Sequence, residues 1–95
     1  MFVILLKFTE RKDSAAQLLA AHNEWIQRGF DEKVFVLVGG LRSRTGGAIL
    51  AVNTSMEALQ ARVNADPFVA EGIVIPDIEE IVPNRVDERL CLLEQ

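Results

Sequence analysis

The sequence predicts a single α+β domain of order βαββαβ, in which a four-stranded antiparallel sheet carries both helices on one face. Three observations carry this prediction: four short apolar runs, two intervening stretches with helical spacing, and a length of 95 residues. A chain of this length forms one domain, because domains usually contain about 100–150 residues. With right-handed crossovers, this order of elements places both helices on the same side of the sheet.

The first strand and the first helix follow from hydrophobic periodicity. Residues 2–8 form an almost continuous apolar run, which is typical of a central strand. A capping-box pattern, Ser14 with Gln17, begins the first predicted helix. This helix ends near Arg28, where Gly29 supplies the stop. Its apolar stripe is spaced i, i+3, i+4, i+7 and consists of Ala15, Leu18, Leu19, His22, Trp25 and Ile26.

The middle of the chain predicts two strands and a second helix. The runs 34–38 and 48–52 are rich in β-branched and aliphatic residues, and they predict the second and third strands. The glycine-rich stretch 39–47 between them is predicted to be a loop within the domain. A second capping-box pattern, Thr54 with Glu57, begins the second helix.

The last third of the chain predicts the end of that helix and a fourth strand. The second helix covers about 56–65, and Asp66-Pro67 ends it because a residue before proline disfavours the helical region. The fourth strand covers 73–82, and Pro76 within it favours an edge position or a bend. For the tail, residues 84–95, the pattern leaves open a short helix or a fifth strand.

Composition and charge restrict the partners and the compartment. A net charge of -4 and a pI of about 4.9 argue against nucleic acid or an anionic membrane as a partner. The chain has one cysteine, Cys91, which cannot form an internal disulfide. It has one histidine, His22, which cannot build a His-rich metal site. We therefore expect no metal and no other cofactor. The apolar N-terminal run is too short for a signal peptide or a membrane span. We therefore expect a cytoplasmic protein.

The first strand is hydrophobic on both of its faces. Alternate side chains of a strand point to opposite sides, so Phe2, Ile4 and Leu6 face one way and Val3 and Leu5 the other. The two helices cover only one side of the sheet. The simplest cover for the other side is the same face of a second copy, which predicts a two-fold homodimer.

His22 and Asp66 are the candidate catalytic residues. A buried imidazole needs a hydrogen-bond partner, and the simplest interpretation of His22 is a core histidine bonded to a backbone carbonyl. Asp66 lies three residues after Val63 and seven after Leu59, which returns it to the same helix face, so its carboxylate is predicted to meet His22. Before Pro67, an aspartate is also typical of a turn in which it caps the next half-turn.

The glycine-rich stretch is the candidate substrate-binding segment. Gly39 and Gly40 allow a ligand to approach the backbone N–H groups closely. Arg42 and Arg44 offer positive charge for a carboxylate, phenolate or phosphate. The alternative is a flexible hairpin with solvated arginines, and the stretch matches no nucleotide-binding fingerprint. Phe68 either lines the same pocket or packs in the core.

Three segments carry a resemblance to a known family. They read LLAAH at 18–22, VFVLVGG at 34–40 leading to GGAIL at 46–50, and NADPFVAEG at 64–72. In order and spacing they resemble the YciI-like family, which has the YCII-related domain, over nearly the whole chain. The resemblance implies a ferredoxin-like fold assembled as a dimeric α+β barrel. It also implies a His/Asp site near the glycine-rich turn, at the positions of His22 and Asp66.

The resemblance also has a departure and a functional implication. Members commonly have Gly-Pro after the second strand, where this chain has Gly39-Gly40, so its loop should be less rigid. One activity in the family is dehydrochlorination of a chlorinated hydroxyhydroquinone. Related barrels include muconolactone isomerases and small monooxygenases.

Two functional hypotheses follow. The first is a small cofactor-free enzyme of isomerase, lyase or dehydrochlorinase type, acting on a small, aromatic or hydroxylated anionic substrate. His22 would be the general base or acid, and Asp66 would fix its tautomer and stabilise the imidazolium. Arg42 or Arg44, with the N–H groups of Gly39 and Gly40, would hold the oxyanion. The alternative is a non-catalytic dimeric small-molecule-binding or accessory domain with a structural His/Asp pair.

Overall fold

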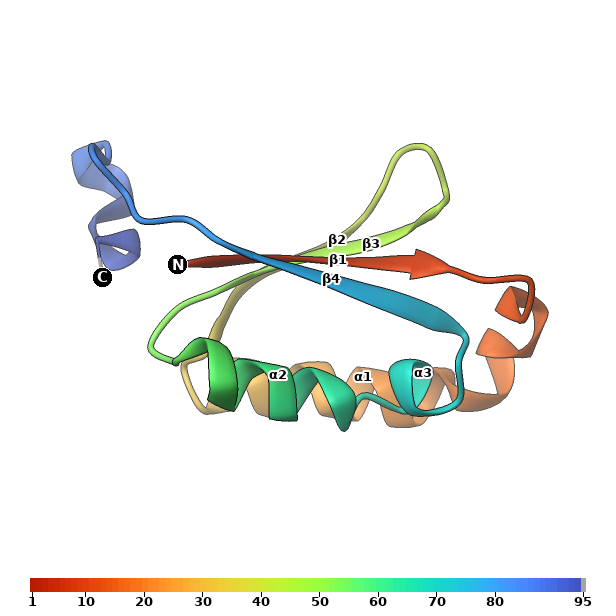
Figure 1. The fold of residues 1–95 in the computed structure, drawn as a ribbon. Helices are drawn as coiled ribbons and strands as arrows, with labels where there is room; N and C mark the ends of the chain where they lie inside the picture. Colours follow the sequence, from red (N-terminus) through yellow and green to blue (C-terminus); the bar gives the residue numbers. More distant parts are fainter. Residues whose placement is uncertain (95) are drawn as a thin grey trace.

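A layer of helices packs against one face of a single sheet (Figure 1). The computed structural model describes residues 1–94, so Gln95, the end of the predicted tail, lies outside the described residues. The strands are β1 (Phe2–Phe8), β2 (Phe35–Gly40), β3 (Gly46–Ala51) and β4 (Val74–Glu80). The helices are α1 (Ala15–Asp31), α2 (Met56–Asn64) and α3 (Pro67–Ala70), with 3₁₀ helices η1 (Lys12–Ser14) and η2 (Glu88–Leu93). The predicted α+β class is confirmed, and α3 is a short helix inserted before β4.

The sheet has the order β2-β3-β1-β4, and every neighbouring pair is antiparallel. The apolar run 2–8 is therefore a central strand, as its composition predicts. On β1, the side chains of Phe2, Ile4 and Leu6 are buried against the helices, and those of the alternate residues are less buried. Pro76 lies in the edge strand β4, where the missing N–H of a proline is best tolerated.

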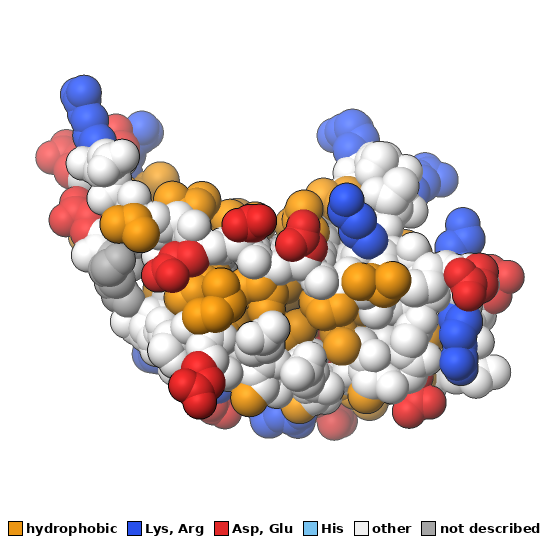
Figure 2. All heavy atoms as spheres, viewed as in Figure 1, with side chains coloured by type: hydrophobic (Ala, Val, Ile, Leu, Met, Phe, Trp, Pro, Cys, Tyr) orange, Lys and Arg blue, Asp and Glu red, His pale blue; other side chains and the backbone are white. Residues whose placement is uncertain are grey.

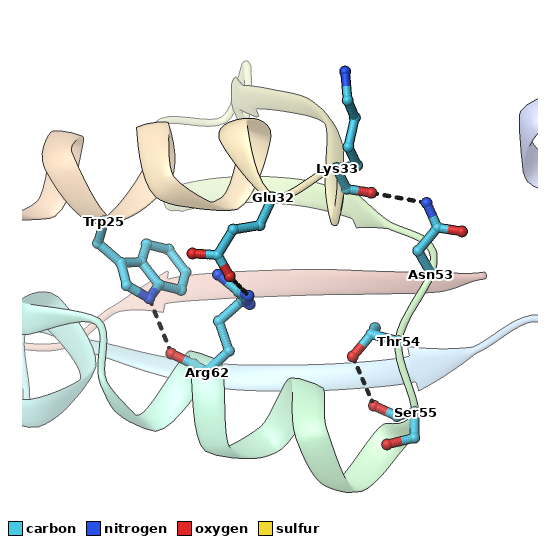
Figure 3. Close-up of polar contacts among 7 residues, drawn as sticks. All are labelled: Trp25, Glu32, Lys33, Asn53, Thr54, Ser55 and Arg62. Carbon is cyan, nitrogen blue, oxygen red and sulfur yellow. Dashed lines mark hydrogen bonds and ion pairs between the residues drawn. The ribbon is translucent and has the colours of Figure 1, made fainter.

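A set of contacts joins α1 to α2 within the helical layer (Figure 3). The indole Nε1–H of Trp25 donates to the carbonyl oxygen of Arg62 at 2.9 Å. The Arg62 guanidinium donates in turn to Glu32 at 2.6 Å and lies over the ring of Phe35, 5.9 Å from its centroid. These contacts fix the position of α1 relative to α2. They therefore also fix where the residues near Trp25 lie relative to the residues that follow α2.

Two helix-start predictions differ from the structure. Ser14 precedes α1, but its side chain makes no capping hydrogen bond, because η1 already gives Ser14 a helical conformation with φ −85° and ψ −3°. At α2 the N-cap is Ser55 and not Thr54, and the Ser55 hydroxyl accepts from the N–H of Ala58 at 3.1 Å. Both helices nevertheless begin close to the predicted positions.

Gly29 does not end α1, which continues to Asp31. Gly29 is buried, and a Cβ at this position would collide with the ring of Phe35. The glycine therefore serves close packing of α1 on β2 and is not a helix stop.

The glycine-rich stretch contains a shorter loop than predicted, because both of its ends are strand. Gly39 and Gly40 pair with Ala48 and Gly47 across β2 and β3, so only residues 41–45 form the turn. Gly46 has a φ of 151°, and a Cβ there would collide with the carbonyl oxygen of Leu6. The longer pairing carries the turn away from the body of the sheet (Figure 1).

The face of the sheet opposite the helices is uncovered within the described chain. Leu37 and Ile75, on this face by their pairing register, are 50% and 64% exposed. Figure 2 shows a hollow on this side, between the C-terminal segment and the β2–β3 turn. In the tail, η2 stands clear of the sheet, so the described residues form a short 3₁₀ helix and no fifth strand. No helix among residues 1–94 is both long and apolar enough to cross a membrane.

Candidate functional site

His22 and Asp66 are in direct contact, as the helical spacing predicts. The Nδ1 atom of His22, on α1, lies 2.7 Å from Oδ1 of Asp66, which follows α2. Asp66 is completely buried, and the His22 side chain is 12% exposed. A carboxylate withdrawn from water in this way is stabilised by hydrogen-bond donors and by any positive charge beside it.

The same carboxylate oxygen also begins α3. Oδ1 of Asp66 accepts from the backbone N–H of Phe68 at 3.0 Å, and Asp66 is the N-cap of this helix. The capping role considered from the sequence and the contact with His22 are therefore both present. Two elements hold the carboxylate in place before any ligand binds.

These bonds determine the state of the imidazole. An ionised carboxylate only accepts hydrogen bonds, so His22 donates through Nδ1–H. In the neutral ring the other nitrogen, Nε2, then carries a lone pair. Nε2 has no hydrogen-bond partner among the described residues, and it can therefore accept a proton from a ligand.

Two aromatic rings fix the plane of the imidazole. The ring of Phe68 stacks on His22 with a centroid distance of 3.9 Å and an interplanar angle of 5°. Trp25, three residues along α1, lies 5.9 Å away at 26°. Because Phe68 covers one face of the imidazole, a ligand cannot stack on that face.

A cavity of about 270 Å³ lies beside His22, between α1 and the sheet. Its lining is mainly aliphatic, aromatic and glycine residues from four strands and two helices: Leu6, Phe8, Leu19, His22, Asn23, Ile26, Val38, Gly39, Gly40, Gly46, Gly47, Ala48, Ile49, Phe68 and Val74. An apolar cavity with a few convergent polar groups is typical of a small-molecule site.

The predicted binding residues fall into two groups. Gly39, Gly40 and Phe68 line the cavity, and a Cβ built on either glycine would meet no atom within 4 Å. Arg42 and Arg44 lie exposed in the 41–45 turn and do not line the cavity of the described chain. The reason is the extended β2–β3 pairing, which moves the arginines beyond the cavity. Their contact with a ligand stays a prediction.

Asn23 is a lining residue that the sequence did not single out. It is exposed and lies outside the predicted stripe of α1, directly after His22. Helical periodicity identifies the side chains that face the sheet, and Asn23 lies at the edge of that set. The one available signal was its position next to the sole histidine.

Comparison with known proteins gives the family. The model of the YCII-related domain matches residues 1–81. The chain belongs to the YCII-related domain family. The YCII-related match ends one residue after β4, so the C-terminal segment 82–94 lies beyond it. No curated protein matches this sequence significantly.

A solved structure supports the fold of this YCII-related protein. It is 5-chloro-2-hydroxyhydroquinone dehydrochlorinase from Burkholderia phenoliruptrix AC1100, in complex with 2,5-dihydroxybenzoquinone. The likeness covers 84% of this chain and 91% of that chain, with a TM-score of 0.69 and 19% sequence identity. At this identity, the likeness establishes a shared fold.

Proposed function

We propose that this YCII-related protein is a small acid–base enzyme in which Nε2 of His22 takes a proton from a ligand in the cavity. The observation that carries the proposal is the 2.7 Å contact of His22 Nδ1 with the buried carboxylate of Asp66. This contact leaves Nε2 as the free nitrogen of a residue that lines an apolar cavity. A base held in this way is typical of general acid–base catalysis.

The geometry supports a simple proton cycle. A hydroxyl of the substrate gives its proton to Nε2, and the imidazolium is stabilised by the negative charge of Asp66 on the other side of the ring. The proton then returns to another atom of the product or passes to water. A positioned acid–base group contributes about 10²- to 10⁴-fold to the rate. We propose that this step uses no cofactor, since the base and its partner belong to the chain.

The cavity favours a ligand of one ring. A cavity of about 150 Å³ accommodates benzene, and the volume here is about 270 Å³. The structurally similar dehydrochlorinase binds a dihydroxylated quinone, which supports a hydroxylated ring as the substrate class of this chain. In a dehydrochlorination the substrate loses one proton and one chloride, and His22 would take the proton.

The uncovered sheet face supports a homodimer. Exposed Leu37 and Ile75 lie on this face, next to the half-buried side chains of Val3 and Leu5. A second copy seated in the hollow of Figure 2 would bury these side chains, which is the usual solution for an isologous two-fold interface. We propose that the protein acts as this dimer.

The proposed enzyme is tested by measuring the chloride that the protein releases from 5-chloro-2-hydroxyhydroquinone. We expect His22→Gln to lower kcat at least 100-fold, because a glutamine is no base. Glu24→Gln is the control, since Glu24 is exposed on the same helix and does not line the cavity. Undiminished turnover in His22→Gln would overturn the role of His22. Ligand binding without turnover by the wild type would favour the non-catalytic alternative.

A further inference from the structure

The polar groups of the cavity are few. Among its described lining residues, His22 and Asn23 are the two whose side chains carry nitrogen or oxygen atoms. The side chains of the remaining lining residues are hydrocarbon or, in the glycines, a single hydrogen atom. A ligand with two polar substituents therefore has two side chains with which it can form hydrogen bonds, and they are neighbours on α1.

Asn23 is free to bind a ligand. Its side chain is exposed, and no hydrogen bond joins it to another described residue. An amide donates two hydrogen bonds through its nitrogen and accepts through its oxygen. It therefore suits either a hydroxyl or a carbonyl oxygen.

The lining also restricts the charge of the ligand. Arg42 and Arg44 lie outside the cavity, so the described lining offers no arginine or lysine to a carboxylate or phosphate. Ionised groups of this kind are costly to bury without such a partner. Hydroxyl and carbonyl oxygens, which Asn23 and His22 can bind, are compatible with this lining.

We infer that Asn23 is the specificity-determining residue of the site, and that it binds a second oxygen substituent of a one-ring ligand whose first hydroxyl faces His22 Nε2. This inference rests on the proposed function. The ring lies toward β2 and β3, where a Cβ at Gly40 would meet no protein atom within 4 Å and the space stays open. A site that hydrogen-bonds two oxygens discriminates strongly against an analogue that has only one.

Simple phenols test this specificity. Phenol, catechol, resorcinol and hydroquinone are titrated into the protein, and NMR signals of His22 give each Kd. We expect the best of the three diols to bind wild-type protein about 10-fold more tightly than phenol, as one hydrogen bond provides. In Asn23→Leu, which has a similar volume and no polar group, we expect this preference to vanish while the Kd of phenol changes less than about 2-fold.

Control variants separate this inference from the proposed function. Gln17→Leu makes the same kind of change at an exposed position of α1 outside the cavity, and it should keep the preference for the diol. Asn23→Ala, checked by its amide spectrum, replaces Asn23→Leu if the leucine disturbs the fold. Equal Kd values of phenol and every diol in the wild type, or a preference that survives loss of the amide, would overturn the role of Asn23 alone. Failure of all four compounds to bind would overturn the ligand class, and with it both proposals.

Discussion

The Oδ1 atom of Asp66 lies 2.7 Å from Nδ1 of His22 and 3.0 Å from the backbone nitrogen of Phe68. One oxygen thus orients the imidazole and starts the helix whose phenyl ring stacks on that imidazole. The hydrogen bond to His22 Nδ1 and the cap of the helix that carries Phe68 both depend on Asp66.

The tautomer of His22 is the most direct prediction. In its neutral form the ring should carry its proton on Nδ1, because Asp66 can only accept. Nitrogen-15 NMR of histidine-labelled protein at alkaline pH distinguishes the two ring nitrogens. A neutral ring with its proton on Nε2 would contradict the proposed direction of the hydrogen bond. In Asp66→Asn, whose amide can donate, we expect the preference for Nδ1–H to weaken.

The two roles of Asp66 should separate by substitution. Asp66→Ala removes the cap of α3 and the partner of His22, and we expect it to lower the free energy of unfolding by about 2–4 kcal/mol. Asp66→Ser keeps an N-cap oxygen and should recover about 1 kcal/mol of this loss without recovering activity. Urea unfolding and chloride release measure the two effects. Equal stability of the alanine and serine variants would show that capping contributes little.

Two glycines that line the cavity, Gly40 and Gly46, should respond differently to substitution by valine. A side chain at Gly40 has open space, so Gly40→Val should change the free energy of unfolding by less than about 1 kcal/mol and should block the cavity. Gly46→Val should unfold the protein or destabilise it severely, because its Cβ collides with the carbonyl oxygen of Leu6. Thermal melts and phenol titrations provide the measurements. Unchanged phenol affinity in Gly40→Val would place the ligand elsewhere.

The proposed dimer predicts the effect of a charge on the uncovered face. Leu37→Glu places a carboxylate on this face, and burying it there has a high cost, so we expect monomers. Light scattering coupled to gel filtration gives the mass directly. Glu24→Gln, on the helical side, should leave the mass unchanged. A wild-type monomer, or a Leu37→Glu variant that remains dimeric, would exclude this face as the interface.

The sequence predicted those features that local patterns determine. The central position of the strand at residues 2–8 follows from its continuous apolar run, and the edge position of Pro76 follows from the missing N–H of a proline. The contact between His22 and Asp66 follows from the 3.6-residue repeats of the two helices. These repeats determine which side chains share a face. Shared faces were sufficient to bring the two residues together.

Features that depend on close tertiary contact could not be predicted in this way. In the sequence Gly29 resembles a helix stop, but a glycine is needed there because the ring of Phe35 packs against it. Phe35 belongs to another element, so no local pattern predicts this contact. The positive charge of Arg42 and Arg44 suggests a contact with a ligand, but a glycine-rich stretch gives no signal that Gly39 and Gly40 pair as strand and carry the 41–45 turn away from the cavity. Asn23 was missed because its part in the site depends on the position of the cavity.

The amide proton of Phe68 can serve as a probe of the contact between His22 and Asp66. This proton is held by the same atom that orients the imidazole, so its exchange with solvent deuterium reports the integrity of the pair without any substrate. Slow exchange at Phe68 would mark an assembled base. When residues of the cavity are substituted, this one backbone signal therefore shows whether the hydrogen bond between His22 and Asp66 is intact.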